Sequence, residues 1–194
     1  MTRLPELPIA EKFRVVARGF SARVDGVTDW DAPTPVKEWR ARDVVAHLHW
    51  IRDVLGDAVT IEPGPSPEDE PAAAWAHLAQ QVQGILEDPA SMDLPHSHPH
   101  TGDNPVPVVI DRIWTGDVFF HTWDLARSAG LDDTLDADLV QDALTGMRQA
   151  EDFLRPTGQF GEQQPVPEDA TETEELMAFL GRDPRWTPPT QVPQ

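Results

Sequence analysis

Two segments of the sequence each place an acid four residues before a histidine. They are DVVAH, with Asp43 and His47, and DVFFH, with Asp117 and His121. Residues four apart on a helix lie one above the other, so the two side chains of each pair can point at one place. Because a charge buried in an apolar run is costly unless something pairs with it or binds it, this pattern favours a metal site between two helices.

Histidine and carboxylate ligands without cysteine suit zinc in an open catalytic site, or iron, nickel or manganese. The spacing also fits a simpler interpretation, in which His47 and His121 are half-buried core residues. Asp43 would then cap a helix and Asp117 would face solvent. The spacing alone leaves both interpretations open.

Other histidines give weaker signals. His96, His98 and His100 alternate in a proline-rich segment, and short histidine-rich tracts can bind metal. Nothing local preorganises them, so we expect a solvated loop or adventitious binding. His49 and His77 stand close to tryptophans and are expected at the edge of the core.

Composition excludes several classes of function. The 194 residues carry 15 basic and 34 acidic side chains, a net charge of −19, which would repel nucleic acid and anionic membranes. The absence of cysteine excludes disulfides, thiolate ligands and a protein thiol nucleophile. There is no P-loop, GxSxG or GxGxxG motif. Without a signal-type N-terminus or a long apolar run, the chain is expected to be soluble and cytoplasmic.

Apolar residues recur at helical spacing in several segments separated by prolines. The pattern predicts an all-α bundle, in one domain over residues 1–186 and with a flexible tail at residues 187–194. Helices are expected over residues 10–27, from about 40 to 56, over 67–89 with Pro71 in the first turn, and over 108–129, 136–154 and 173–182. Residues 90–107 are expected to form a loop, with at most a short extended piece.

Three longer segments resemble one known family. They are WDAPTPVKEWRARDVVAHL, GDVFFHTWDLARSAG and the C-terminal PVPEDATETEELMAFLGRDPRW. The first two are similar to the signatures of the mycothiol-dependent maleylpyruvate isomerase-like metal-binding domain, in the DinB/YfiT-like superfamily. The third is similar to the end of an uncharacterised subgroup of it.

This resemblance implies a DinB/YfiT-like four-helix bundle with additional C-terminal helices. It implies a divalent metal held by His47, Asp117 and His121. Asp124 would orient an imidazole or bind an arginine, and Asp43 would cap its helix. The acid that matches Asp117 is often glutamate in the family, so a shorter carboxylate would require a helix shift or an intervening water.

The implied activity is thiol-dependent transfer or isomerisation, in which the metal activates a thiol or water. Zinc is the first choice of metal, with nickel, iron or manganese as alternatives, and the thiol would be mycothiol or another low-molecular-weight thiol. The partners would be this thiol and an electrophilic substrate, with the protein a monomer or homodimer. Trp50 and Trp114 would shape the pocket. The alternatives are a non-catalytic metal- or ligand-binding module, and a bundle that has lost its metal.

Overall fold

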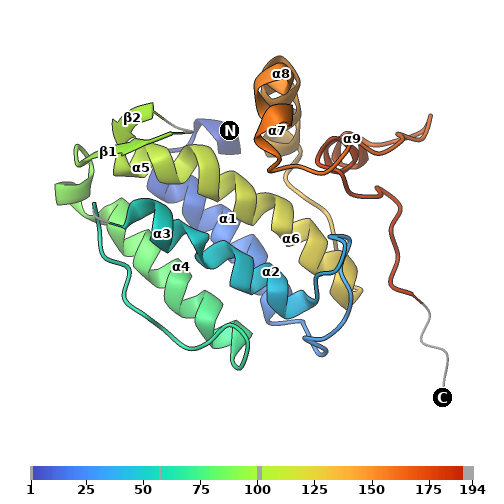
Figure 1. The fold of residues 1–194 in the computed structure, drawn as a ribbon, viewed down its shortest axis with the longest axis horizontal. Coiled ribbons are helices and arrows are strands. Elements are labelled where there is room, and N and C mark those ends of the chain that lie inside the picture. Colours follow the sequence, from blue (N-terminus) through green and yellow to red (C-terminus); the bar gives the residue numbers. More distant parts are fainter. Residues whose placement is uncertain (1, 57, 100–101, 190–194) are drawn as a thin grey trace.

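The computed structural model describes residues 2–56, 58–99 and 102–189. His100 and residues 190–194 of the expected tail lie outside this part of the chain. The described chain is an all-α, DinB-like bundle with additional C-terminal helices, as predicted (Figure 1). No helix within it is long and apolar enough to cross a membrane. The assignment of residues 1–186 to a single domain stays a prediction.

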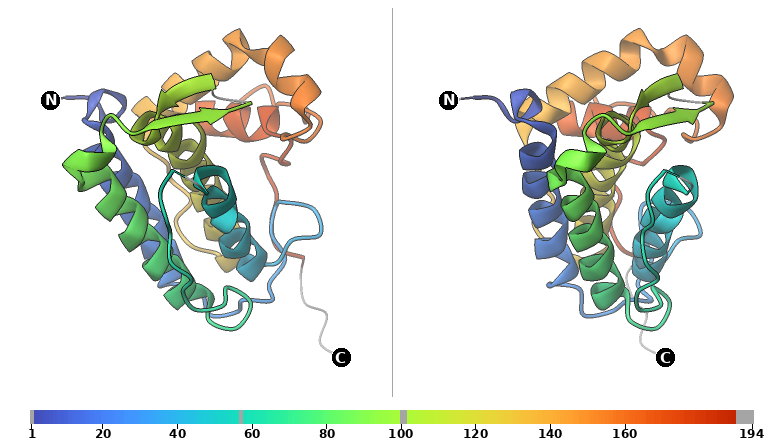
Figure 2. Two further views of the ribbon diagram at one scale, coloured as in Figure 1. Left: turned by 60° about the vertical axis from the view of Figure 1, so that its left-hand side comes forward. Right: turned by 90° about the vertical axis from the view of Figure 1, so that its left-hand side faces the viewer.

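Four helical segments form the bundle. Helix α1 packs against α4 and α6, and α2 packs against both α4 and α6. Figure 2 shows α1 and α4 side by side in both views. The segments are α1 (Ile9–Val24), α2 (Ala41–His47) continued by η2 (Leu48–Trp50) and α3 (Ile51–Leu55), α4 (Pro71–Glu87), and α5 (Val106–Val109) continued by η4 (Ile110–Thr115) and α6 (Gly116–Ala129).

The remaining elements cover the ends of the bundle. Helices α7 and α9 pack against each other, and α7 also meets η1 near the N-terminus. Strands β1 and β2 pair antiparallel, with Pro95 opposite Pro105. The elements are η1 (Leu4–Glu6), η3 (Pro89–Ser91), β1 (Pro95–His98), β2 (Gly102–Pro105), α7 (Ala137–Gln149), α8 (Glu151–Leu154), η5 (Arg155–Thr157) and α9 (Glu172–Phe179).

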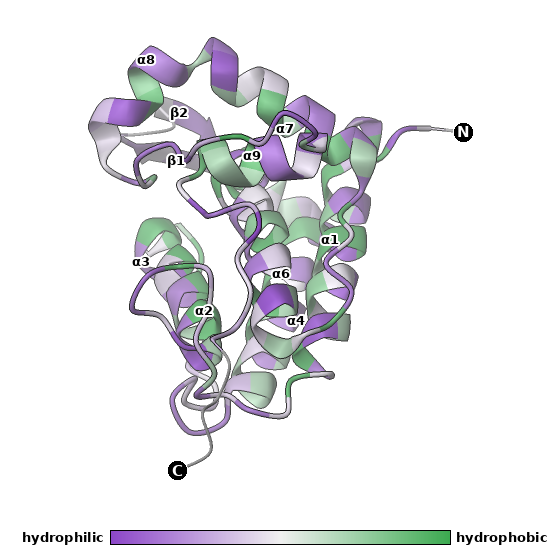
Figure 3. Ribbon diagram, turned by 90° about the vertical axis from the view of Figure 1, so that its right-hand side faces the viewer, coloured by the Kyte–Doolittle hydropathy of each residue, from purple (hydrophilic) through white to green (hydrophobic). Residues whose placement is uncertain are grey.

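The core forms where the apolar faces of the bundle helices meet, and Figure 3 shows hydrophobic residues along α1 and α6. The face predicted for α1 is buried, and it comprises Phe13, Val16, Ala17, Phe20 and Val24. The Phe20 ring lies 4.4 Å from the Trp75 ring of α4, centroid to centroid. Three- and four-residue spacing thus places one continuous stripe against its neighbours.

Local signals set the helix ends as expected. Pro71 is the first residue of α4, where its missing N–H costs nothing. The Asp136 carboxylate accepts a hydrogen bond from Leu139 N and caps α7. Gly130 ends α6 with a φ of 65°, and Leu131 N donates to Ala126 O, as in a Schellman motif.

Three local features differ from the sequence prediction. The helix expected from residue 108 begins at Val106 and contains the π-helical segment η4. The helix expected from about 40 to 56 passes through the 3-10 turn η2. The helix expected over residues 136–154 is divided at Ala150 into α7 and α8. None of these changes the helical pattern enough to show in a 3.6-residue period, which is the reason they were missed. The short extended piece expected within residues 90–107 is present as the two four-residue strands β1 and β2.

Gly181, which follows the C-cap residue Leu180 of α9, has a φ of 90°, and a Cβ built there would lie 2.6 Å from Gly161 Cα. At Gly130 the φ is also left-handed, but a Cβ would meet nothing within 4 Å. We predict that Gly130→Ala lowers the free energy of unfolding by about 1 kcal/mol, because only backbone strain is added. Gly181→Ala should cost about 2–4 kcal/mol, since backbone atoms must also move.

Urea denaturation of both variants checks this difference. An equal loss of stability at the two positions would contradict the close backbone approach at Gly181.

Candidate metal centre

The structure brings His47, Asp117 and His121 together from two helices. His47 is the last residue of α2, and Asp117 and His121 lie one turn apart on α6. The potential ligand atoms of the three side chains all lie within 4.8 Å of one another. The fold therefore brings the three residues predicted as metal ligands close together.

Asp117 is shared between the two imidazoles. Its Oδ2 lies 3.0 Å from His47 Nε2, and its Oδ1 lies 3.4 Å from His121 Nε2. Trp50 Nε1 also donates to Oδ2 over 2.8 Å. Burial disfavours ionisation of Asp117, but the positive charge of His121 and the hydrogen bonds outweigh it and hold its pKa well below the usual range. The carboxylate is thus ionised, as a metal ligand must be.

His121 is held from its other ring nitrogen. Its Nδ1 lies 2.8 Å from Asp124 Oδ2, and because an ionised carboxylate only accepts, Nδ1 donates this bond. Nε2 is thereby turned toward Asp117 and His47. Burial disfavours the imidazolium, but the Asp117 charge, followed by Asp124, outweighs it and raises the pKa of His121 to about 9.

Asp124 is completely buried and is bound by a second cation. Arg182 donates to both of its oxygens, from the terminal nitrogen over 2.9 Å and from Nε over 3.3 Å. Burial raises the pKa of a carboxyl, yet Arg182 and then His121 lower the pKa of Asp124 below its usual value. The arrangement of an arginine, a carboxylate and an imidazole matches the support that metal-binding histidines commonly have.

Trp39 covers the two imidazoles. Its ring centroid lies 4.8 Å from that of His47 and 5.6 Å from that of His121. The loop before α2 presents it through a bend in which Glu38 has a φ of 69°, a region that non-glycine residues rarely adopt. Thr34 N donates to Trp39 O and fixes the bend. Such strain persists only where the surroundings enforce it.

The structure also shows the positions of the other residues that the sequence singled out, Asp43, Trp50 and Trp114. Asp43 accepts a hydrogen bond from Arg40 N at the start of α2, so it caps the helix. Trp50 lines a pocket and contacts Asp117. Trp114 does not line the pocket, because its indole is buried and donates to Leu48 O. The expectation that Trp114 shapes the pocket is therefore wrong.

The three donors fit a divalent cation. Ligands about 2.0–2.2 Å from a tetrahedral zinc lie roughly 3.3 Å from one another. Asp117 Oδ2 lies 3.0 Å from His47 and Asp117 Oδ1 lies 3.4 Å from His121, close to this spacing. One ligand atom from each residue can be chosen so that all three lie within 4.8 Å of one another, so a bound cation would draw the set closer together. The His121 side chain is only 3% exposed, whereas His47 is 33% and Asp117 22% exposed. One side of the cluster therefore faces solvent, as an open catalytic site requires.

Residues 13–126 match the family model of the mycothiol maleylpyruvate isomerase N-terminal domain. The chain belongs to this family. It is also 32% identical over 157 residues to the uncharacterized proteins MT0763 and Rv0738 of two Mycobacterium tuberculosis strains, covering 79% of this chain and 85% of each relative. No solved structure gave a significant match.

Arg182 lies beyond the residues that match the mycothiol maleylpyruvate isomerase N-terminal domain. The family resemblance implied that Asp124 orients an imidazole or binds an arginine, without indicating which arginine that would be. The only local signal is a glycine directly before Arg182, which permits the turn after α9. The C-terminal segment thus supplies a contact to the site that the matched domain alone does not contain.

We predict that Arg182→Met lowers the free energy of unfolding by about 3–5 kcal/mol, because Asp124 would keep a buried charge without its main partner. The control is Arg185→Met, which breaks an exposed pair with Asp169 and a longer contact with Glu174 and should cost much less, because exposed ion pairs contribute little to stability. Denaturant unfolding measures both.

A double variant Arg182→Met with Asp124→Asn should recover part of the loss, since the unpaired charge is then gone. Equal losses in the Arg182 and Arg185 variants would show that the buried pair has no special importance.

Proposed function

We propose that the protein is a divalent-metal-dependent enzyme of the thiol-dependent transferase or isomerase type. One observation carries the proposal: two imidazole nitrogens and an ionised carboxylate converge on one point. The buried Asp124 contacts this group on the protein side, and His47 is partly exposed to solvent on the other side. Membership of the mycothiol maleylpyruvate isomerase N-terminal domain family supports the thiol. Zinc is the metal that this donor set suits first, with nickel, iron or manganese as alternatives.

Each residue of the site has a distinct task in this proposal. His47, Asp117 and His121 hold the cation, and Asp124 keeps His121 in the tautomer that presents Nε2. The Trp50 indole fixes one carboxylate oxygen of Asp117. When bound, the cation supplies a Lewis acid that lowers the pKa of a thiol or water.

The nucleophilic sulfur must come from a small molecule, because the chain has no cysteine. We propose mycothiol or another low-molecular-weight thiol as that molecule, with an electrophilic small molecule as the second substrate. The strongly negative surface is consistent with small-molecule partners, since it would repel nucleic acid.

We predict that the purified protein binds one divalent ion per chain and that His121→Ala abolishes this binding. The loss should exceed the roughly 10–100-fold effect of changing groups that only orient a ligand. Titration of chelator-treated protein with zinc, nickel, manganese and iron(II), together with elemental analysis, measures it. His77→Ala is the matched control, because His77 lies on α4 and bonds Glu62 O outside the site.

Asp117→Glu tests the short carboxylate in the same titration. Tighter binding in this variant would mean that aspartate weakens the site, whereas unchanged binding would mean that aspartate is an accepted ligand. If the wild-type protein binds none of the four metals, the proposed metal centre is wrong.

We predict that the metal-loaded protein transfers a thiol to electrophilic test substrates and that His47→Ala removes this activity. His47 is the most exposed of the three potential ligands. Without it, only Asp117 and His121 would remain to bind the cation. A thiol-consumption assay with mycothiol measures the rate. Metal binding without any transfer would favour the alternative function, a non-catalytic metal- or ligand-binding module.

A further inference from the structure

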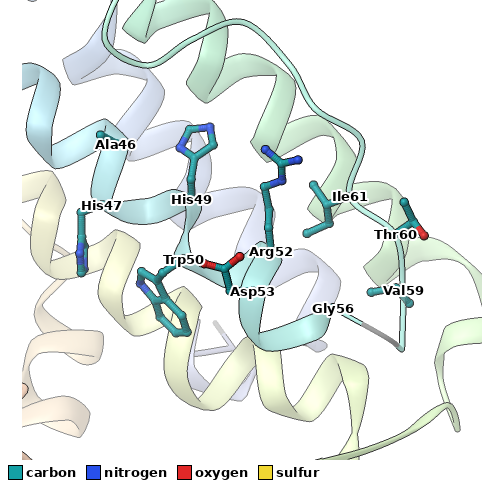
Figure 4. A pocket seen from close by; sticks show the side chains of 10 residues that line it. All are labelled: Ala46, His47, His49, Trp50, Arg52, Asp53, Gly56, Val59, Thr60 and Ile61. Carbon is teal, nitrogen blue, oxygen red and sulfur yellow. The ribbon is translucent and has the colours of Figure 1, made fainter.

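A pocket of about 580 Å³ lies along the outer side of η2 and α3. The chain after α3 forms its far wall, with Val59, Thr60 and Ile61 (Figure 4). His47 and Trp50 line its near end and also contact Asp117. The pocket therefore borders the candidate metal centre, although its lining extends well beyond the three potential ligands.

Arg52 is the one arginine of the pocket lining, and its guanidinium has no acid within ion-pair distance in the described part of the chain. The other half-buried arginines that the structure describes each pair with an acid, and they are Arg23, Arg40, Arg42, Arg127, Arg155 and Arg182. In a chain with 34 acidic residues, a half-buried arginine without such a partner is an exception that needs an explanation.

Asp53 lines the same pocket but does not neutralise Arg52. Adjacent residues on a helix do not face each other, and Figure 4 shows the two side chains directed to different sides of α3. His49 Nδ1 donates a hydrogen bond to Val45 O, so this ring nitrogen is already used within its own helical segment. Arg52 is thus the one permanent cation among the residues that line the pocket.

Figure 4 shows the side chains of His49 and Arg52 extending in the same direction from η2 and α3. A guanidinium presents a planar set of donors that matches a carboxylate with two parallel hydrogen bonds. The size of the pocket suits a small molecule rather than a macromolecule. Each carboxylate group carries a single negative charge, so at Arg52 it suffers less repulsion from Asp53 and from the acidic surface than a phosphate group that carries two.

We propose that this pocket binds the carboxylate of a small organic acid through Arg52. This inference goes beyond the proposed function and holds whether or not the neighbouring centre carries a metal. In Figure 4 the side chains of His47 and Trp50 extend away from the direction of Arg52, so the acid would lie on the His49 side of the pocket, apart from the candidate metal centre.

The test uses full-length, chelator-treated protein, so that a carboxylate cannot bind through a metal. Titration calorimetry with succinate should show saturable binding, which weakens with added salt because it depends on charge. Arg52→Gln should reduce the affinity at least tenfold, and Arg52→Lys should lose less. Asp53→Asn should bind succinate several-fold more tightly, since a repelling charge is removed.

The matched control is Arg18→Gln. Arg18 is an exposed arginine of α1 outside the pocket lining, and no described acid lies within ion-pair distance of it, so this variant should bind succinate like the wild-type protein. Thermal unfolding followed by circular dichroism confirms that each variant is folded. The side-chain Nε–H signal of Arg52 in NMR spectra should shift on addition of succinate.

Three outcomes would overturn the proposal. They are no succinate binding by the wild-type protein, equal affinity in the Arg52→Gln variant, and tighter binding of inorganic phosphate than of succinate. None of them bears on metal binding at His47, Asp117 and His121, so failure of this proposal is distinguishable from failure of the proposed function.

Discussion

The complete burial of Asp124 is the constraint on which the site depends. A carboxylate removed from water is unstable unless cations and hydrogen bonds replace its hydration. Arg182 supplies one cation from the C-terminal segment, and His121 supplies a ring N–H from the same helix. Because Asp124 needs Arg182 as well as His121, the chain after α9 must pack against the bundle at α6.

The same constraint organises the groups in front of Asp124. His121 can present only Nε2 to the open side, and Asp117 faces that nitrogen while also meeting His47 and Trp50. Nitrogen donors and carboxylates therefore alternate from Arg182 to His47. A divalent cation fits this order, since it would replace the protons that the two imidazoles otherwise share with Asp117.

The two proposed binding sites also differ in the charge of the ligand that they would bind. The chain is strongly acidic, and its half-buried arginines elsewhere in the described structure are neutralised by neighbouring acids. The metal centre would attract a cation through Asp117, whereas the pocket offers Arg52 to an anion. His47 and Trp50 border both sites, but Arg52 extends away from them in Figure 4, so the two preferences would act on separate ligands.

The sequence by itself determined the helical fold, the buried face of α1, the first turn of α4, the C-terminal end of α6, the start of α7, and the four-residue spacing of Asp117 and His121. All of these depend on periodicity or on contacts within a few residues, which a sequence states directly. Only the tertiary structure decided that Trp39 covers the imidazoles, that Arg182 reaches Asp124 across 58 residues, and that Arg52 is left without an acid. Such contacts depend on how loops and helices pack in three dimensions, and no local pattern records which distant side chain will fill a buried position.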